Sequence, residues 1–243
     1  MNIIKLNAID STNSYLIELG KKERLTDPTI VVSEKQLKGR GQLGATWQSK
    51  PMQSLTFSVF KRFKGVPVLH LSSITFAVSI GVYKTLNKML VPQLRIKWPN
   101  DILSYSKKLA GILIENQVKQ GEIVSTVIGI GININEEKFE NLPHATSMLL
   151  STGRKHLLDE VLHAVSEAIL KELERVEQGE FQDLKNEYEN TLFRKNIVSV
   201  FEDTQGNRFN GKIKGVSKAG ELLIEKEDEK ITSYLLKEIK YLL

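Results

Sequence analysis

The 243-residue sequence predicts an α+β protein in which a mixed sheet with flanking helices is followed by a small β domain. Short strand-like runs alternate with helical ones up to about residue 190. Beyond Arg194 only short strands separated by turns are expected. This change of pattern places a boundary near residues 191–195, so we predict domains at residues 1–192 and 193–243, both within ordinary domain sizes.

The first 135 residues are expected to alternate between strands and helices. Asp10-Ser-Thr-Asn13 follows an extended run at residues 3–9 and precedes apolar residues at helical spacing. It therefore marks a strand-to-helix junction with a capping residue. Residues 72–90 carry apolar side chains with the period of a helix, which ends before Pro92. The other strands expected in this part are residues 29–33, 55–60, 94–98, 111–115 and 123–134.

The second half begins with helices and ends with strands. Residues 157–176 form a long amphipathic pattern, and residues 181–192 form a shorter helical one. Four short strands are then expected, at residues 198–201, 208–216, 222–225 and 231–235. Short strands at this spacing are typical of a small barrel.

The composition excludes several kinds of site. The chain has no cysteine, which excludes disulfides, zinc-thiolate sites and a cysteine nucleophile. Lys and Arg number 34 against 29 Asp and Glu, and this modest excess suits an anionic ligand such as a nucleotide, or an acidic protein. No signal-peptide pattern and no apolar run of roughly 20 residues are present, so we expect a soluble, cytoplasmic protein without a membrane partner.

The string Gly39-Arg-Gly-Gln-Leu-Gly44 is a candidate anion-binding loop. Consecutive amides in Gly-rich turns can form a concave anion site, and Arg40 adds donors suited to a carboxylate or phosphate. The spacing matches a bare Gly-x-Gly-x-x-Gly without a Rossmann context, and the missing Gly-Lys-Ser/Thr ending excludes a P-loop. A flexible surface turn explains the loop equally well. Trp47 either stacks on a flat ring or belongs to the core.

Three further strings have a functional and a structural interpretation each. Lys97-Trp-Pro-Asn-Asp101 is either part of a site or a strand ending in a turn, since Pro, Asn and Asp favour turns. Lys108-Leu-Ala-Gly111 places a lysine beside small residues, although most lysines are simply exposed. In Gly129-Ile-Gly-Ile-Asn133 the glycines indicate a close approach of backbone or ligand, or a bulge.

The order of these motifs is more specific than any one of them. Ser11-Thr-Asn13, Gln36, Gly39-Arg-Gly41, Trp47 and then the three strings from Lys97 to Asn133 follow one another along residues 8–135. This order resembles the catalytic domain of biotin–protein ligases, which has a fold like that of class II aminoacyl-tRNA synthetases. The final β domain resembles the small SH3-like barrel of bacterial members.

The resemblance implies an activity and its partners. The enzyme would activate biotin with ATP and Mg²⁺ as biotinyl-5'-AMP, with release of pyrophosphate. It would then transfer biotin to a lysine of a biotin carboxyl carrier protein. It would act as a monomer or a weak homodimer. Only ten residues precede Ser11, too few for a helix-turn-helix domain, so we expect a ligase that does not bind DNA.

The resemblance also implies the roles of individual residues. Lys108 and Arg40 would be the catalytic cations, and Asp101 would bind the metal. The biotin site would comprise Ser11, Thr12, Asn13, Gln36, Arg40, Gly41, Gln42, Lys108, Gly111, Leu113, Gly129 and Gly131. The ATP site would comprise Arg40, Trp47, Asn100, Lys108 and Asn133, with Trp47 stacking on adenine.

The chain departs from the family pattern within the Gly-rich loop. Many members carry a second arginine where this chain has Gln42, and some carry a basic residue where Ala45 and Thr46 stand. Glutamine keeps hydrogen-bond donors but loses the positive charge. We therefore expect weaker retention of biotinyl-AMP than in arginine-bearing relatives.

Two alternatives remain open from the sequence. A lipoate–protein ligase or octanoyltransferase shares the fold and a lysine in a similar place. A non-catalytic module that binds RNA or an acidic partner belongs to a different class, but it leaves the ordered motifs unexplained.

Overall fold

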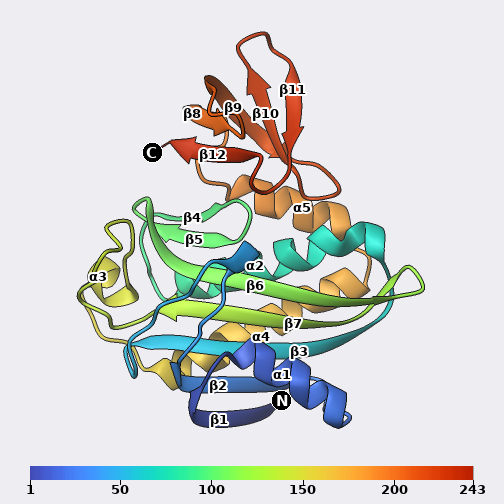
Figure 1. The fold of residues 1–243 in the computed structure, drawn as a ribbon, viewed down its shortest axis with the longest axis vertical. Coiled ribbons are helices and arrows are strands. Elements are labelled where there is room, and N and C mark those ends of the chain that lie inside the picture. The colour runs from blue at the N-terminus through green and yellow to red at the C-terminus, as the bar shows by residue number, and fades with distance from the viewer. Residues whose placement is uncertain (243) are drawn as a thin grey trace.

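The computed structural model describes residues 1–242, which form a seven-stranded sheet and a five-stranded sheet (Figure 1). The larger sheet has the order β1-β2-β3-β7-β6-β5-β4. Its strands are β1 (Asn2–Ile9), β2 (Thr29–Gln36), β3 (Ser54–Pro67), β4 (Leu94–Lys97), β5 (Asp101–Ser104), β6 (Lys107–Lys119) and β7 (Glu122–Asn133). The β1–β2 pair is parallel and the other pairs are antiparallel, which confirms the predicted mixed sheet.

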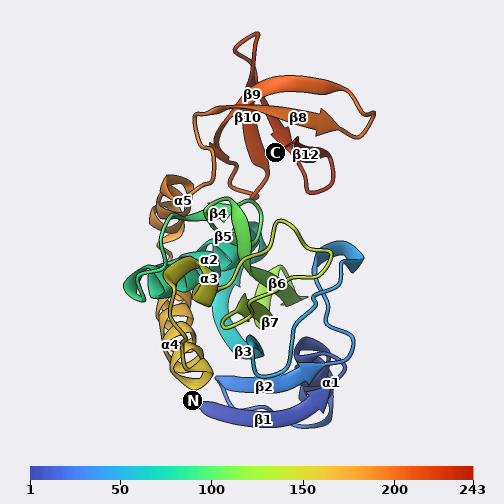
Figure 2. The ribbon, with the colours of Figure 1, turned by 90° about the vertical axis from the view of Figure 1, so that its left-hand side faces the viewer.

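Helices lie on both sides of the larger sheet (Figure 2). On one side, α2 (Leu71–Lys88) and α4 (Leu158–Glu177) pack against each other, with α5 (Phe181–Asn190) beside α2. Gly81 of α2 permits this close packing, since a Cβ there would come within 2.9 Å of the Ile169 Cα. On the other side lies α1 (Thr12–Lys22), and the short α3 (Met148–Thr152) follows β7. None of the helices within residues 1–242 combines the length and apolar character needed to cross a bilayer.

The two faces of the sheet differ in chemistry because successive side chains of a strand point to opposite sides. Phe57, Ile112 and Ile130 belong to the main hydrophobic core, which includes residues of α2 and α4. The neighbouring positions on the same strands are Ser58, Gly111 and Gly131, so they lie on the side of α1. The apolar face stabilises the fold, and the opposite face is left small and polar.

The five-stranded sheet is antiparallel, with the order β11-β10-β9-β8-β12. Its strands are β8 (Val198–Asp203), β9 (Arg208–Val216), β10 (Leu222–Lys226), β11 (Ile231–Tyr234) and β12 (Ile239–Leu242). This arrangement confirms the small C-terminal β unit. Its likeness to an SH3 barrel and the boundary after residue 192 stay predictions.

Hydrogen bonds attach the smaller sheet to the rest of the chain. Trp98 Nε1 donates to the Gly220 carbonyl at 2.8 Å, and the Val216 amide donates to Glu189 Oε1 at 2.9 Å. Trp98 is itself a core residue, 6% exposed. The motif that contains Trp98 therefore also helps to position the C-terminal sheet.

Among the strands and α-helices, three were not expected from the sequence: β5, α3 and β12. They have only four, five and four residues, too short for a periodic pattern to be recognised. The strands β3 and β6 extend well beyond the predicted runs at residues 55–60 and 111–115. Their additional residues are a mixture of charged, polar and apolar ones, and most of them are recruited by antiparallel pairing with β7 or β5.

Candidate active site

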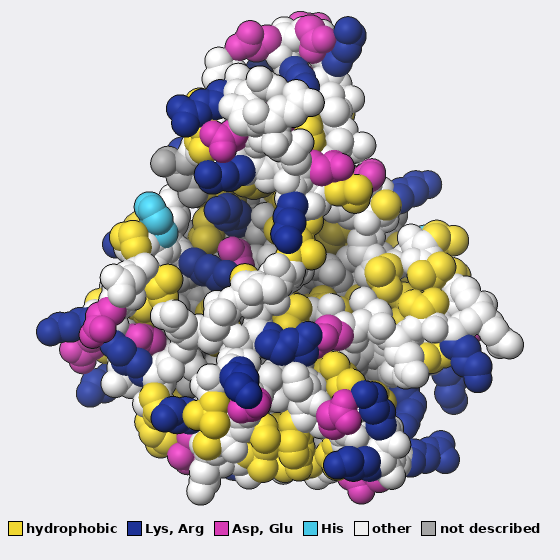
Figure 3. Space-filling model, in the orientation of Figure 1, with side chains coloured by type: hydrophobic (Ala, Val, Ile, Leu, Met, Phe, Trp, Pro, Cys, Tyr) yellow, Lys and Arg dark blue, Asp and Glu magenta, His cyan; other side chains and the backbone are white. Residues whose placement is uncertain are grey.

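A cavity of about 740 Å³ opens between the larger sheet and the C-terminal sheet. Figure 3 shows a hollow beneath the C-terminal sheet with Lys and Arg side chains around it. The cavity is lined by α1, the Gly-rich loop and strands β4 to β7. Leu236 and Lys237, from the turn before β12, and Tyr241 of β12 also line it. The C-terminal sheet therefore forms part of its wall.

The floor of the cavity is formed by Gly111, Leu113, Gly129 and Gly131. Gly111 pairs with Gly131 across β6 and β7, and Leu113 pairs with Gly129. A Cβ at Gly131 would overlap the Trp47 ring, and a Cβ at Gly129 would overlap the Asn13 carboxamide. The glycines are therefore required because other side chains approach the bare backbone here, as the sequence pattern indicated.

The start of α1 forms one end of the cavity through a buried polar network. Ser11 caps the helix, and the Thr12 amide donates to Gln36 Oε1 at 2.8 Å. Ser58 Oγ lies 2.7 Å from Thr12 Oγ1 and also contacts Asn13 Oδ1. Sequence reasoning missed Ser58. The sequence feature that could have identified it is a serine inside the apolar run of β3, since a buried hydroxyl needs a hydrogen-bond partner.

The Gly-rich loop is folded as a small hairpin. The Gly41 amide donates to the Ala45 carbonyl at 2.7 Å, and the Trp47 amide donates to the Gly39 carbonyl at 3.0 Å. The hairpin brings the Trp47 ring over the floor, where a Cβ at Gly111 would lie 3.0 Å from it. Within residues 1–242 its buried indole N–H has no hydrogen-bond partner. A half-buried aromatic ring with an unused donor suits a ligand that offers both a flat ring and an acceptor.

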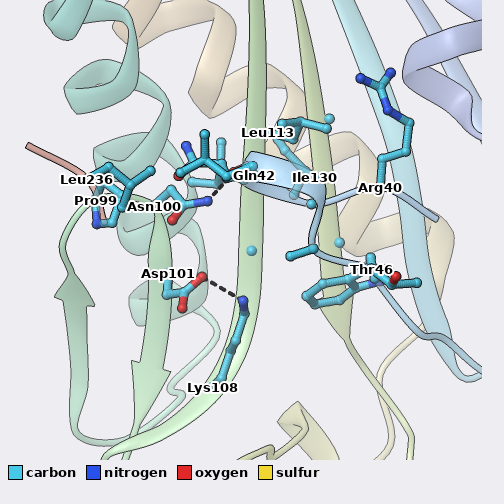
Figure 4. Close-up of a pocket in the computed structure, with 18 of the residues that line it drawn as sticks. Arg40, Gln42, Thr46, Pro99, Asn100, Asp101, Lys108, Leu113, Ile130 and Leu236 are labelled. Carbon is cyan, nitrogen blue, oxygen red and sulfur yellow. Dashed lines mark hydrogen bonds and ion pairs between the residues drawn. The ribbon is translucent and has the colours of Figure 1, made fainter. Parts of the chain in front are cut away.

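Lys108 points into the cavity because the β5–β6 pairing shifts its register. Asp101 pairs with Gly111, but beyond Ile102 the alignment slips so that Leu103 pairs with Lys108. Lys108 lies an odd number of positions from Gly111, so in a regular strand its side chain would point to the face opposite the cavity. Lys108 Nζ forms an ion pair with Asp101 Oδ1 at 2.7 Å and lies 5.6 Å from the Trp47 ring centroid (Figure 4).

A second cavity of about 460 Å³ adjoins the Asp101–Lys108 pair and is rich in basic residues. Lys97, His144 and Lys240 line it together with that pair. Burial lowers the pKa of Lys97; Asp101 opposes this effect and Lys108 adds to it. The lysines of this cavity are suited to a polyanion such as a triphosphate.

Asp101 is the single carboxylate among the described residues that line the main cavity. No cluster of three or more His, Cys, Asp or Glu side chains within residues 1–242 is arranged to hold a metal ion. Magnesium, however, commonly binds through one or two carboxylates together with phosphate oxygens of a substrate. The residues present therefore fit a magnesium ion that enters with a nucleotide.

Arg40, expected to be a catalytic cation together with Lys108, points away from Lys108 (Figure 4) and is bound to Glu115. Its guanidinium donates from Nη2 to Glu115 Oε1 at 2.7 Å, from Nη1 to Glu115 Oε2 at 3.2 Å, and from Nη1 to Ser14 Oγ at 3.1 Å. Figure 4 shows it turned away from the Asp101–Lys108 pair. Nothing in the spacing around Glu115 predicted that it would hold this arginine.

The structure brings together the expected site residues with one exception. Those that line the main cavity are Ser11, Thr12, Asn13, Gln36, Arg40, Gly41, Gln42, Trp47, Asn100, Asp101, Lys108, Gly111, Leu113, Gly129 and Gly131. Asn133 does not line it: its side-chain amide donates to the Thr146 carbonyl at 2.9 Å, and the residue is 4% exposed. The roles assigned to all of these residues, adenine contact by Asn133 included, stay predictions.

Residues 6–133, more than half of the chain, match the Biotin/lipoate A/B protein ligase family. The chain belongs to this family. Among solved structures it is similar to the biotin protein ligase of Aquifex aeolicus in complex with biotin and ATP. The two share 27% identity with a TM-score of 0.81, and the match covers 99% of this chain and 98% of the other.

Two curated relatives show the extent of the sequence similarity. The bifunctional ligase/repressor BirA of Bacillus spizizenii is 32% identical over 159 residues, which cover 63% of this chain and 48% of the relative. The biotin–[acetyl-CoA-carboxylase] ligase of Mycobacterium tuberculosis is 33% identical over 142 residues, which cover 57% and 52%. The matched part of the chain thus spans about half the length of these members of the family.

The close contact between Gly129 and Asn13 yields a prediction about stability. We expect Gly129→Ala to lower the free energy of unfolding by about 1–3 kcal/mol, because the added methyl displaces the Asn13 carboxamide from a packed, hydrogen-bonded position. In an Asn13→Ala background the same substitution is expected to have less than half that effect. Urea unfolding of the wild type, the two single variants and the double variant measures this coupling. Equal losses in both backgrounds would contradict the described contact.

Proposed function

We propose that the chain is an ATP-dependent biotin–protein ligase that forms biotinyl-5'-AMP and then transfers biotin to a lysine of a biotin carboxyl carrier protein. The main support for the proposal is that three features line one cavity: buried hydrogen-bonding side chains, a floor of glycines and the Lys108 cation. Family membership and the similarity to a ligase solved with biotin and ATP support it.

The end of the cavity beside α1 suits the ureido ring of biotin. Thr12 and Asn13 line this end, and Ser58 forms hydrogen bonds with both; all three are less than 4% exposed. A site built from such groups rejects ligands that leave those groups unpaired. Gly129 and Gly131 let the Asn13 carboxamide and the Trp47 ring lie directly against the backbone, which leaves the space beside them for a flat, narrow ligand body.

The nucleotide end of the site would lie over Trp47 and the basic second cavity. Trp47 offers a ring for stacking on adenine. Asp101 would hold magnesium, which would supply positive charge to the triphosphate. Lys97 and Lys240 lie beside this carboxylate and suit the β- and γ-phosphates.

The first step joins two anions, so electrostatics determines its rate. A biotin carboxylate oxygen attacks the α-phosphorus of ATP, the bond to the β-phosphate oxygen breaks, and pyrophosphate leaves with the bonding electrons. Lys108 would lie between the two anions and offset both their repulsion and the charge that grows on the phosphoryl oxygens. This role requires that Lys108 exchange Asp101 for the reacting groups.

The second step needs positioning more than activation. The neutral amine of the carrier lysine attacks the acyl carbon of biotinyl-AMP, AMP leaves, and the amine proton passes to solvent. The mixed anhydride is already reactive, so the enzyme gains rate mainly by holding the amine in place. The exposed rim near Leu236 and Lys237 gives the carrier access.

A lipoate–protein ligase is the competing function within the same family, and ligand binding separates the two. We expect biotin at saturating concentration to raise the melting temperature, because it uses the buried polar groups beside α1. Lipoate and octanoate, which lack a ureido ring, are expected to leave it unchanged. Differential scanning fluorimetry with the three acids makes the comparison. Stabilisation by lipoate and not by biotin would contradict the proposal.

The position of Lys108 yields a kinetic prediction. We expect Lys108→Ala to reduce biotin-dependent pyrophosphate release about 10²–10³-fold, as for the loss of one preorganised donor, with little change in melting temperature. Lys107→Ala is the matched control, since Lys107 is the preceding residue of β6 and is exposed. Pyrophosphate release from Lys108→Ala at the wild-type rate would refute the role of this lysine.

A further inference from the structure

Glu115 is the centre of a hydrogen-bonded group that joins three separate elements. It lies on β6, its Oε2 accepts from Asn13 Nδ2 of α1 at 2.8 Å, and both of its oxygens accept from Arg40 of the Gly-rich loop. Two of the residues expected to bind biotin, Asn13 and Arg40, are therefore oriented by one carboxylate that does not itself line the cavity.

The contact with Arg40 has the geometry of a bound carboxylate ligand. The two guanidinium nitrogens face the two oxygens, at 2.7 and 3.2 Å, in the forked arrangement that arginine uses for carboxylates. The biotin carboxylate and the phosphate of biotinyl-AMP offer the same pattern of acceptors. Glu115 thus occupies the donors that an acidic ligand needs.

The pair is exposed enough for its partners to exchange. The Arg40 side chain is 44% exposed and the Glu115 side chain 28% exposed. The formation of an ion pair in such a position changes the equilibrium constant of folding or binding by only about one and a half to fivefold. A ligand held by the rest of the site can therefore displace Glu115 from Arg40.

We propose that Glu115 is a specificity-determining residue that acts as the internal counterion of Arg40 and is replaced there by the acid group of the ligand. Without an acidic ligand, Glu115 satisfies the guanidinium and holds the loop against α1. A ligand without a negative charge cannot replace it. Glu115 therefore competes with every acidic ligand for Arg40 and does not affect the binding of neutral ones. Its separate hydrogen bond with Asn13 keeps the Asn13 carboxamide oriented. This inference rests on the proposed function.

The test compares biotin with its neutral amide by isothermal titration calorimetry. Glu115→Gln removes the charge but keeps an oxygen that can accept from Asn13. We expect it to bind biotin about two- to fivefold more tightly than the wild type and to bind biotinamide with unchanged affinity. Asp159→Asn is the matched control, because it also removes one carboxylate from an exposed ion pair, with Lys5, away from the cavity. We expect it to change neither affinity.

A second variant tests the mechanism. In an Arg40→Gln background, Glu115→Gln is expected to leave the ratio of the two affinities unchanged. Without the guanidinium of Arg40 there is no group for which Glu115 and the ligand carboxylate compete. An unchanged ratio in the single Glu115→Gln variant, or biotin binding weakened more than biotinamide binding, would overturn the inference while leaving the ligase proposal intact. Failure of the wild type to bind either ligand would overturn both.

Discussion

The backbone floor of β6 and β7 is the constraint on which the site depends. Antiparallel pairing places Gly111 opposite Gly131 and Leu113 opposite Gly129, so three of these four positions have no Cβ on the side of α1. Trp47 and Asn13 occupy the space that side chains would fill. The same strands bury Ile112 and Ile130 on the other face. One pair of strands therefore supplies both the core of the fold and the open surface of the cavity.

Two cations of the site are each paired with a carboxylate of the chain. Lys108 pairs with Asp101 and Arg40 pairs with Glu115, each cation with a carboxylate on β5 or β6. All four side chains are between 22% and 44% exposed, which keeps the cost of separating them modest. Preformed pairs of this kind keep the two cations oriented, and in the proposed function an anionic ligand would replace the carboxylates.

The larger elements of the fold could be predicted because their periodicity is strong. The apolar spacing in α2 and the capping residue Ser11 before α1 each determine an element from local chemistry. The short strand β5 could not be predicted in this way. It is stabilised by pairing on both edges, with β4 and β6, rather than by its own four residues.

Some site residues could likewise be predicted from the sequence, and others could not. The glycines, Trp47, Lys108 and Asp101 could be named from motifs, because the chain keeps them in a recognisable order. The partner of Arg40 could not be predicted: Glu115 follows Arg40 by 75 residues and approaches it only after β6 has been placed beside α1. Asn133 is the opposite case, because it belongs to a motif but does not line the cavity. It lies at the end of β7, where its side-chain amide donates to the Thr146 carbonyl.

The most direct test of the account is mass spectrometry of the nucleotides formed when the purified protein is incubated with ATP, magnesium and biotin. The account predicts biotinyl-AMP and an equal amount of pyrophosphate, both dependent on biotin. Folded protein that binds ATP and biotin yet forms no adenylate would contradict it.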